Sequence, residues 1–178
     1  MEFDDKNNGE APGIRLRLKE LLFDCLFICG LLLLLFIITL LFYFRVFKGI
    51  PEFTNMQSQL IATITSVVPI IIVFSIMEGS KHFASWGKRK ANLIIIYKGD
   101  PMKGSIIRNI LKFLPWQFGH MSTINGMYSD FNTPFSLIFL ILSFSLSIVY
   151  ILMAFIRKDG RHLADILAGN QVIKNNNK

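Results

Sequence analysis

Long apolar runs, separated by short polar and basic stretches, dominate the pattern of this chain. Three of them, residues 21–44, 60–78 and 134–156, are long enough to cross the hydrocarbon core of a bilayer as helices. Residues 21–44 exceed the core of a secretory signal and lack a small-residue cleavage site, so we expect this helix to be retained. Pro69 lies inside the second run, where neighbouring hydroxyl groups can satisfy the carbonyl that it frees. The pattern predicts an all-α membrane protein, a bundle of three long transmembrane helices.

Residues 105–124 form a fourth, shorter segment, in which apolar positions are mixed with the basic residues Arg108 and Lys112. We expect this segment to be irregular, either amphipathic or re-entrant, because three residues interrupt its pattern: Pro115, His120 and Asn125.

The distribution of lysine and arginine distinguishes three crossings from four. If residues 105–124 cross, fifteen of the 19 basic residues lie on one side and only Arg45 and Lys48 on the other. Arg108 and Lys112 then lie near the cytoplasmic end of the crossing, where long basic side chains can snorkel. If the segment lies flat, the division is twelve against seven. The positive-inside rule therefore predicts four crossings of the cell membrane, with both termini cytoplasmic.

The remaining segments are polar. Residues 1–13 are acidic and predict a disordered cytoplasmic tail, and residues 174–178 form a second tail. Between the second and third long runs, residues 79–90 are basic, and residues 91–97 contain a run of leucine and isoleucine that ends at the turn signal 98–101. We predict a short strand here, within the cytoplasmic loop.

The composition also predicts a membrane protein whose main partner is the lipid bilayer, because 52% of the residues are hydrophobic and only 17% are charged. The net charge is +7, and the basic residues that cause it flank the apolar runs. They therefore indicate the orientation of the protein in the membrane and not nucleic-acid binding. We expect no enzyme activity, catalytic residue, cofactor or metal, since no nucleophile has a base at suitable spacing and the three histidines have no ligand partners. Cys25 and Cys29 are expected to be small buried side chains and not a disulfide or metal pair.

Three charged residues enter the first apolar run on one helical face: Arg17, Glu20 and Asp24. A carboxylate at the centre of a bilayer costs about 2.5 to 3.5 kcal/mol on insertion scales. A carboxylate in an apolar run therefore needs a structural or functional explanation. Two explanations are open. The adjacent carboxylates raise each other's pKa and could bind a proton or a cation, or the face could be a structural ion-pair clamp.

Further charged residues reach the same level under the four-crossing topology: Glu78, Arg108, Lys112 and Asp165. Charges remote in sequence could then pair inside a dry bundle. Under the three-crossing topology, Asp165 would lie on the opposite side.

Several of these residues lie in stretches that resemble the RDD family, small bacterial integral membrane proteins named for one arginine and two aspartates. Arg17 and Asp24 match the opening arginine and aspartate at the family's seven-residue spacing. Residues 78–89 are similar to a segment in which a glutamate and a glycine precede a hydroxyl residue and Gly-Lys-Arg, and this likeness adds Lys88 to the candidates. Residues 161–172, RHLADILAGNQV, resemble the closing stretch, with Asp165 as the second aspartate.

The resemblance covers residues 14–173 and implies one membrane domain. Arg108 and Asn109 also match an arginine-asparagine pair of some members, but Ala164 and Asn170 stand where the family usually has histidine and threonine. If that histidine relays protons in relatives, His162 could substitute for it from one turn away.

The resemblance implies transport or exchange of protons and small monovalent cations, as suggested for some members. The candidate residues for this function, or for a purely structural charge cluster, are Arg17, Glu20, Asp24, Glu78, Lys88, Arg108 and Asp165. A transporter of this size is expected to be a homo-oligomer, because four short crossings rarely enclose a pathway alone. The alternative is a non-enzymatic scaffold, accessory or immunity-like protein that binds a partner at its cytoplasmic face.

Overall fold

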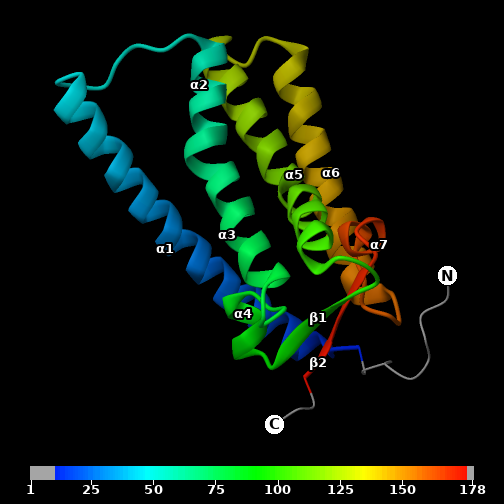
Figure 1. Cartoon of the computed structure of the whole chain (residues 1–178). Helices are drawn as coiled ribbons and strands as arrows, with labels where there is room; N and C mark the ends of the chain where they lie inside the picture. Colours follow the sequence, from blue (N-terminus) through cyan, green and yellow to red (C-terminus); the bar gives the residue numbers. More distant parts are fainter. Residues whose placement is uncertain (1–10, 176–178) are drawn as a thin grey trace. The chain divides into compact units, whose positions relative to one another are not determined.

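The computed structural model describes residues 11–175, so the predicted tail at residues 1–13 lies almost wholly outside the described part, as does most of the tail at 174–178. Figure 1 shows the order of the elements along the chain, which are α1 (Ile14–Val46), α2 (Asn55–Ala62), η2 (Thr63–Val67), α3 (Val68–Gly79), α4 (Trp86–Lys90), β1 (Leu93–Tyr97), α5 (Pro101–Tyr128), α6 (Pro134–Ile156), α7 (Leu163–Leu167) and β2 (Asn170–Lys174).

The described chain divides into two compact units. The first unit contains residues 11–27, 72–112 and 148–175, and the second contains residues 28–71 and 113–147.

Three helical stretches are long and apolar enough to span a membrane: Ile14–Val46, Asn55–Gly79 and Pro134–Ile156. The predicted class is therefore confirmed: a mostly helical membrane protein with three long apolar helices. The first two helices are longer than the runs 21–44 and 60–78 predicted from hydropathy, because polar turns extend them at their ends.

The second long helix widens ahead of Pro69. Residues Thr63–Val67 form a π-helical turn, and the Val68 N–H donates to the Thr63 carbonyl five residues earlier. Three hydroxyl side chains around this turn donate to the carbonyl four residues before them, at distances of 2.8, 2.7 and 2.5 Å: Thr63, Thr65 and Ser66. A π-turn beside a proline absorbs the irregularity that proline imposes on a helix.

The interruption expected at Pro115, His120 and Asn125 is absent, because α5 is one continuous helix from Pro101 to Tyr128. Pro115 cannot donate to the carbonyl of Leu111, four residues earlier. The hydroxyl of Tyr150 donates to that carbonyl instead, at 2.8 Å. Residues 105–124 are therefore helical throughout, and a side chain from another helix replaces the backbone hydrogen bond that Pro115 cannot make. The amphipathic or re-entrant placement of this segment in the membrane stays a prediction.

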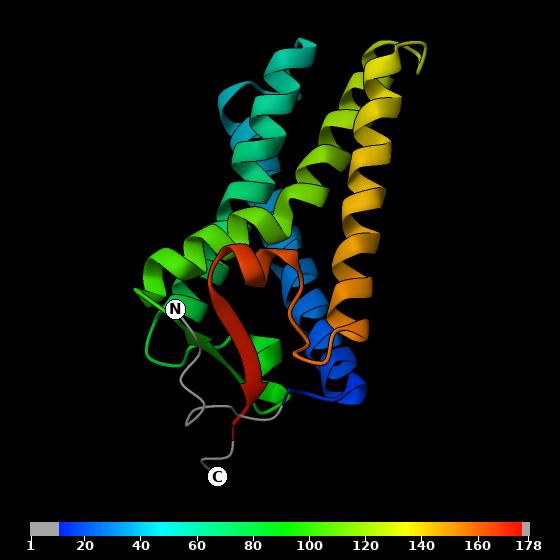
Figure 2. The ribbon, with the colours of Figure 1, turned by 90° about the vertical axis from the view of Figure 1, so that its right-hand side faces the viewer.

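In the first unit, β1 and β2 form a two-stranded antiparallel sheet, with Ile95 opposite Val172. The two strands lie side by side in Figure 2. The inward side chains of Leu93 and Ile95 from β1 and Val172 from β2 form a small hydrophobic core with Ala91. The strand predicted near residues 93–96 is confirmed, whereas β2 includes Lys174, which had been placed in a tail.

In the second unit, the C-terminal half of α5 runs antiparallel to two other helices. Toward α2 and η2, Asn125 bonds to Asn55 at 2.7 Å and Gln117 to Thr63 at 2.9 Å. Toward α6, the Ser122 hydroxyl donates to the Ser136 carbonyl, and the Ser143 hydroxyl donates to the Pro115 carbonyl, both at 2.7 Å. This half of α5 thus lies between two of the apolar helices, and Figure 1 shows α5 next to α6.

Candidate functional site

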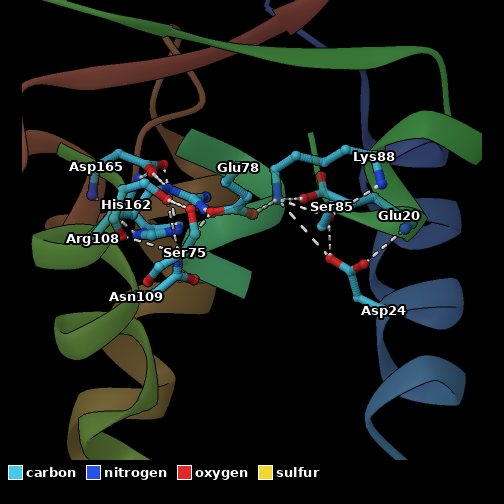
Figure 3. Close-up of polar contacts among 12 residues, drawn as sticks. Glu20, Asp24, Ser75, Glu78, Ser85, Lys88, Arg108, Asn109, His162 and Asp165 are labelled. Atoms are coloured by element: carbon cyan, nitrogen blue, oxygen red, sulfur yellow. Dashed lines mark hydrogen bonds and ion pairs between the residues drawn. The ribbon is translucent and has the colours of Figure 1, made fainter. Parts of the chain in front are cut away.

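All seven charged residues predicted from the sequence meet in the first unit, and none is more than 9% exposed. We call them the charge network: Arg17, Glu20 and Asp24 from α1, Glu78 from α3, Lys88 from α4, Arg108 from α5 and Asp165 from α7. Figure 3 shows six of these side chains converging from opposite sides of the view. Segments far apart in the sequence therefore depend on one buried electrostatic cluster.

Acids and bases alternate along the network. The ion pairs, in order, are Arg17–Glu20 at 3.4 Å, Glu20–Lys88 at 2.7 Å, Lys88–Glu78 at 2.8 Å, Glu78–Arg108 at 2.6 Å and Arg108–Asp165 at 2.5 Å. Arg17 also donates a hydrogen bond of 2.7 Å to the carbonyl of Gly160. Gly160 precedes α7, so both ends of the network, Arg17 and Asp165, contact the C-terminal part of the chain. Such pairing offsets much of the large cost of burying isolated charges.

Lys88 is the centre of the network. It lies on the short helix α4, whose first turn is capped by Ser85, because the Ser85 hydroxyl accepts from the Lys88 N–H at 3.4 Å. Its ammonium contacts Glu20 and Glu78 closely and lies 3.9 Å from Asp24. Burial by itself lowers the pKa of Lys88, but the carboxylates of Glu20 and Glu78 outweigh it, so the pKa is raised and the side chain is charged at neutral pH.

Asp24 is held differently from the other three acids. Its Oδ1 accepts from the Gly87 N–H at 2.7 Å and its Oδ2 accepts from the Ser85 hydroxyl at 2.8 Å. The Lys88 ammonium lies 3.9 Å from Asp24, farther than the two neutral donors, which are the backbone N–H of Gly87 and the hydroxyl of Ser85. Gly87 permits this approach, because a Cβ there would lie 2.6 Å from Asp24 Oδ1 and would also collide with the Glu20 carbonyl.

Asn109 is a member of the site that the sequence did not assign, as are Ser85 and Gly87. The Asn109 amide donates to Glu78 Oε2 at 3.0 Å and to the Ser105 carbonyl on its own helix at the same distance. Its signal in the sequence was the pair Arg108 and Asn109, which resembles the arginine-asparagine pair of some RDD members. Ser85 and Gly87 could have been found as a helix cap followed by a small residue.

His162 contacts Asp165, the acid at the end of the network. Its Nδ1 accepts from the Asp165 N–H at 3.4 Å, and its Nε2 lies 3.4 Å from Asp165 Oδ2. Burial lowers the pKa of His162 to about 4, although the Asp165 carboxylate acts in the opposite direction. For Asp165, burial opposes ionisation, but the guanidinium of Arg108 dominates and the pKa is lowered. His162 therefore lies two residues before Ala164, in contact with the second aspartate, and is neutral at pH 7.

The other sequence expectations have mixed outcomes. Cys25 and Cys29 are exposed on α1 and not buried, because the described chain does not cover that face of the helix. Lys112 places its ammonium 5.0 Å from the centre of the Phe74 ring. Within residues 11–175, no three histidine, cysteine, aspartate or glutamate side chains are placed to hold a metal ion.

The helices and the buried charge network define a multi-pass helical membrane protein. The model of the RDD family matches residues 11–169, which is most of the chain, so this protein belongs to the RDD family. No curated protein and no solved structure matches it.

Proposed function

We propose that this protein exchanges protons and small monovalent cations across the cell membrane, and that Asp24 is the group that binds them in turn. It performs no covalent chemistry in this proposal. In this proposal both termini and the charge network face the cytoplasm.

The observation that carries the proposal is the environment of Asp24. This carboxylate is 4% exposed, yet it has no short ion pair of the kind that binds Glu20, Glu78 and Asp165. Its donors are a hydroxyl group and a backbone N–H. A carboxylate without a close fixed counter-charge can bind a proton or a monovalent cation at lower cost than one that must first break a salt bridge.

The neighbouring groups suit such a site. Lys88 keeps Glu20 and Glu78 paired, so these acids supply negative potential while leaving Asp24 as the exchangeable group. Arg17 limits that potential from the other side of Glu20. The Ser85 hydroxyl can accept a hydrogen bond from a protonated Asp24, or offer its oxygen to a cation next to the ionised form.

The proposal requires four crossings, of which α5 is the fourth. In the second unit, α5 is antiparallel to α2, η2 and α6 and forms hydrogen bonds with them. This is the packing expected of a helix that crosses the membrane beside other spanning helices. With α5 crossing, the positive-inside rule gives cytoplasmic termini. We also propose a homo-oligomer, because four short crossings rarely enclose a pathway alone.

Reconstitution tests the proposal. Purified protein in proteoliposomes with an acidic interior and an internal pH dye should dissipate the proton gradient when Na⁺, K⁺ or Li⁺ is added outside. Asp24→Asn, which preserves shape and removes the charge, should abolish this response. Glu52→Gln, an exposed carboxamide substitution outside the network, is the matched control and should behave like wild type. An inactive wild type, or an active Asp24→Asn protein, would exclude Asp24 as the exchange group.

A scaffold or accessory protein that binds a partner at its cytoplasmic face is the second candidate. It is favoured by the continuity of the charge network, which resembles a clamp that fixes several segments at once. Exposed basic residues around that clamp could contact an acidic partner: Lys81, Arg89, Lys90, Lys98 and Lys103. Proteoliposomes without exchange, together with cross-linking of a stable partner through Lys90 or Lys98, would favour this function.

A further inference from the structure

The second unit contains a histidine that the charge network does not use. His120 lies on α5, eight residues from the end of the helix, or about 12 Å along its axis. It faces the π-helical turn Thr63–Val67, where Ser66 Oγ lies 3.2 Å from His120 Nε2. An ionisable side chain at this depth in a spanning bundle indicates a functional group.

The hydrogen bonds around His120 fix its protonation. The indole N–H of Trp116, which can only donate, points at His120 Nε2 from 2.6 Å. Nε2 must therefore be the unprotonated nitrogen, and the single ring hydrogen of the neutral imidazole is on Nδ1. Trp116 lies one turn before His120 on the same helix, with the two rings tilted by 32°.

Ser66 Oγ and His120 Nε2 face each other as two hydrogen-bond acceptors. Its hydroxyl hydrogen is committed to the Ala62 carbonyl, 2.5 Å away. The contact between Ser66 Oγ and His120 Nε2 therefore contains no hydrogen, although both atoms have lone pairs. One added proton fits between them: it would sit on Nε2 and donate to Ser66 Oγ.

We propose that His120 Nε2 is a proton-binding site within the second unit, and that proton binding there releases Trp116. When Nε2 takes a proton, the ring carries hydrogens on both nitrogens and the indole N–H loses its acceptor. Ser66 Oγ accepts the new N–H while still donating to the Ala62 carbonyl. The groups placed against the ring are Ser66 from η2 and Trp116 from α5 itself, and neither is charged.

This inference deepens the proposed exchange, and only its role in transport rests on that proposal. Proton binding itself is an equilibrium property and needs no gradient. Substitutions of Trp116 and Ser66 should change the proton affinity of His120 in opposite directions. Trp116→Phe removes the donor that competes for Nε2 and should tighten proton binding about fivefold, whereas Ser66→Ala removes the acceptor of the added hydrogen and should weaken it about fivefold.

Nuclear magnetic resonance of protein labelled at histidine, in nanodiscs, measures the titration midpoint of His120, with the signal assigned by its loss in His120→Gln. Ser58→Ala removes a hydroxyl that bonds to Tyr128 in the same unit, and should leave the midpoint unchanged. Opposite shifts in Trp116→Phe and Ser66→Ala support the proposal. Shifts in the same direction, or none, overturn it.

A second readout covers the case in which a variant fails to fold. Trp116 and Trp86 are the two tryptophans of the chain, so Trp86→Phe leaves Trp116 as the only tryptophan, which can be excited selectively over the four tyrosines. Its fluorescence should change at the midpoint of His120 and stay constant in the Trp86→Phe/His120→Gln protein. An identical titration in both proteins would contradict the proposal. Proteoliposomes that lack exchange while these shifts occur would refute the proposed function and leave the proton site standing.

Discussion

Lys88→Met tests how strongly the charge network stabilises the first unit. Methionine keeps the length and apolar stem of lysine but removes the ammonium that pairs with Glu20 at 2.7 Å and with Glu78 at 2.8 Å. Removing one partner of a buried ion pair costs about 3 to 5 kcal/mol, chiefly because the remaining charge stays buried and uncompensated. For a chain of this length, each kcal/mol lowers the melting temperature by about 2 to 4 °C, so we expect a decrease of about 6 to 20 °C.

Thermal unfolding in detergent, followed by circular dichroism, measures this decrease. Lys90→Met is the matched control: Lys90 lies on the same helix, is exposed, and places its ammonium 5.8 Å from the centre of the Trp86 ring. Its loss should cost about 1 kcal/mol or less. Adding Glu20→Gln to Lys88→Met should cost less than the sum of the two single changes, because it removes one unpaired carboxylate. Equal melting temperatures for the two methionine variants, or strictly additive effects, would refute the reasoning.

Three further predictions concern single contacts. Gly87→Ala places a Cβ 2.3 Å from the Glu20 carbonyl and should lower stability by about 1 to 3 kcal/mol in thermal unfolding, whereas Gly99→Ala, with open space around it, should be close to neutral. Because the pKa of His162 falls from 6.5 to about 4 on folding, stability should be complete above pH 6.5 and fall by up to about 3 kcal/mol toward pH 4; His162→Gln should flatten this part of the pH profile, and an unchanged profile would contradict the assignment. Tyr150→Phe leaves the carbonyl freed by Pro115 without its donor and should cost about 1 to 2 kcal/mol in denaturant unfolding, and a cost no larger than that of Tyr43→Phe would contradict this role.

Hydropathy located the three long helices because the signal of a spanning helix is a property of consecutive residues. The same signal could not describe α5. Its continuity depends on Tyr150, a side chain 39 residues away that satisfies the Leu111 carbonyl. Similarly, β2 carries little apolar pattern of its own and is defined by pairing with β1.

The composition of the charge network was predictable, because a charge retained in an apolar setting needs partners. Its geometry was not. Spacing along one helix predicted that Arg17, Glu20 and Asp24 share a face, but only the tertiary structure shows that Lys88 comes between Glu20 and Glu78. The distinct position of Asp24, bound by neutral donors from α4 and its cap, depends on how closely Gly87 approaches α1, which no local pattern encodes.

Competition between cations and protons at Asp24 is the most direct test of the proposed exchange. Purified protein in a weakly buffered detergent solution is mixed with NaCl, KCl or LiCl, and the released protons are measured with a pH dye. Choline chloride, whose cation is much larger than Na⁺, K⁺ or Li⁺, corrects for ionic strength. We predict proton release from wild type and from Lys90→Met, and none from Asp24→Asn. No release from wild type, or equal release from Asp24→Asn, would contradict the account.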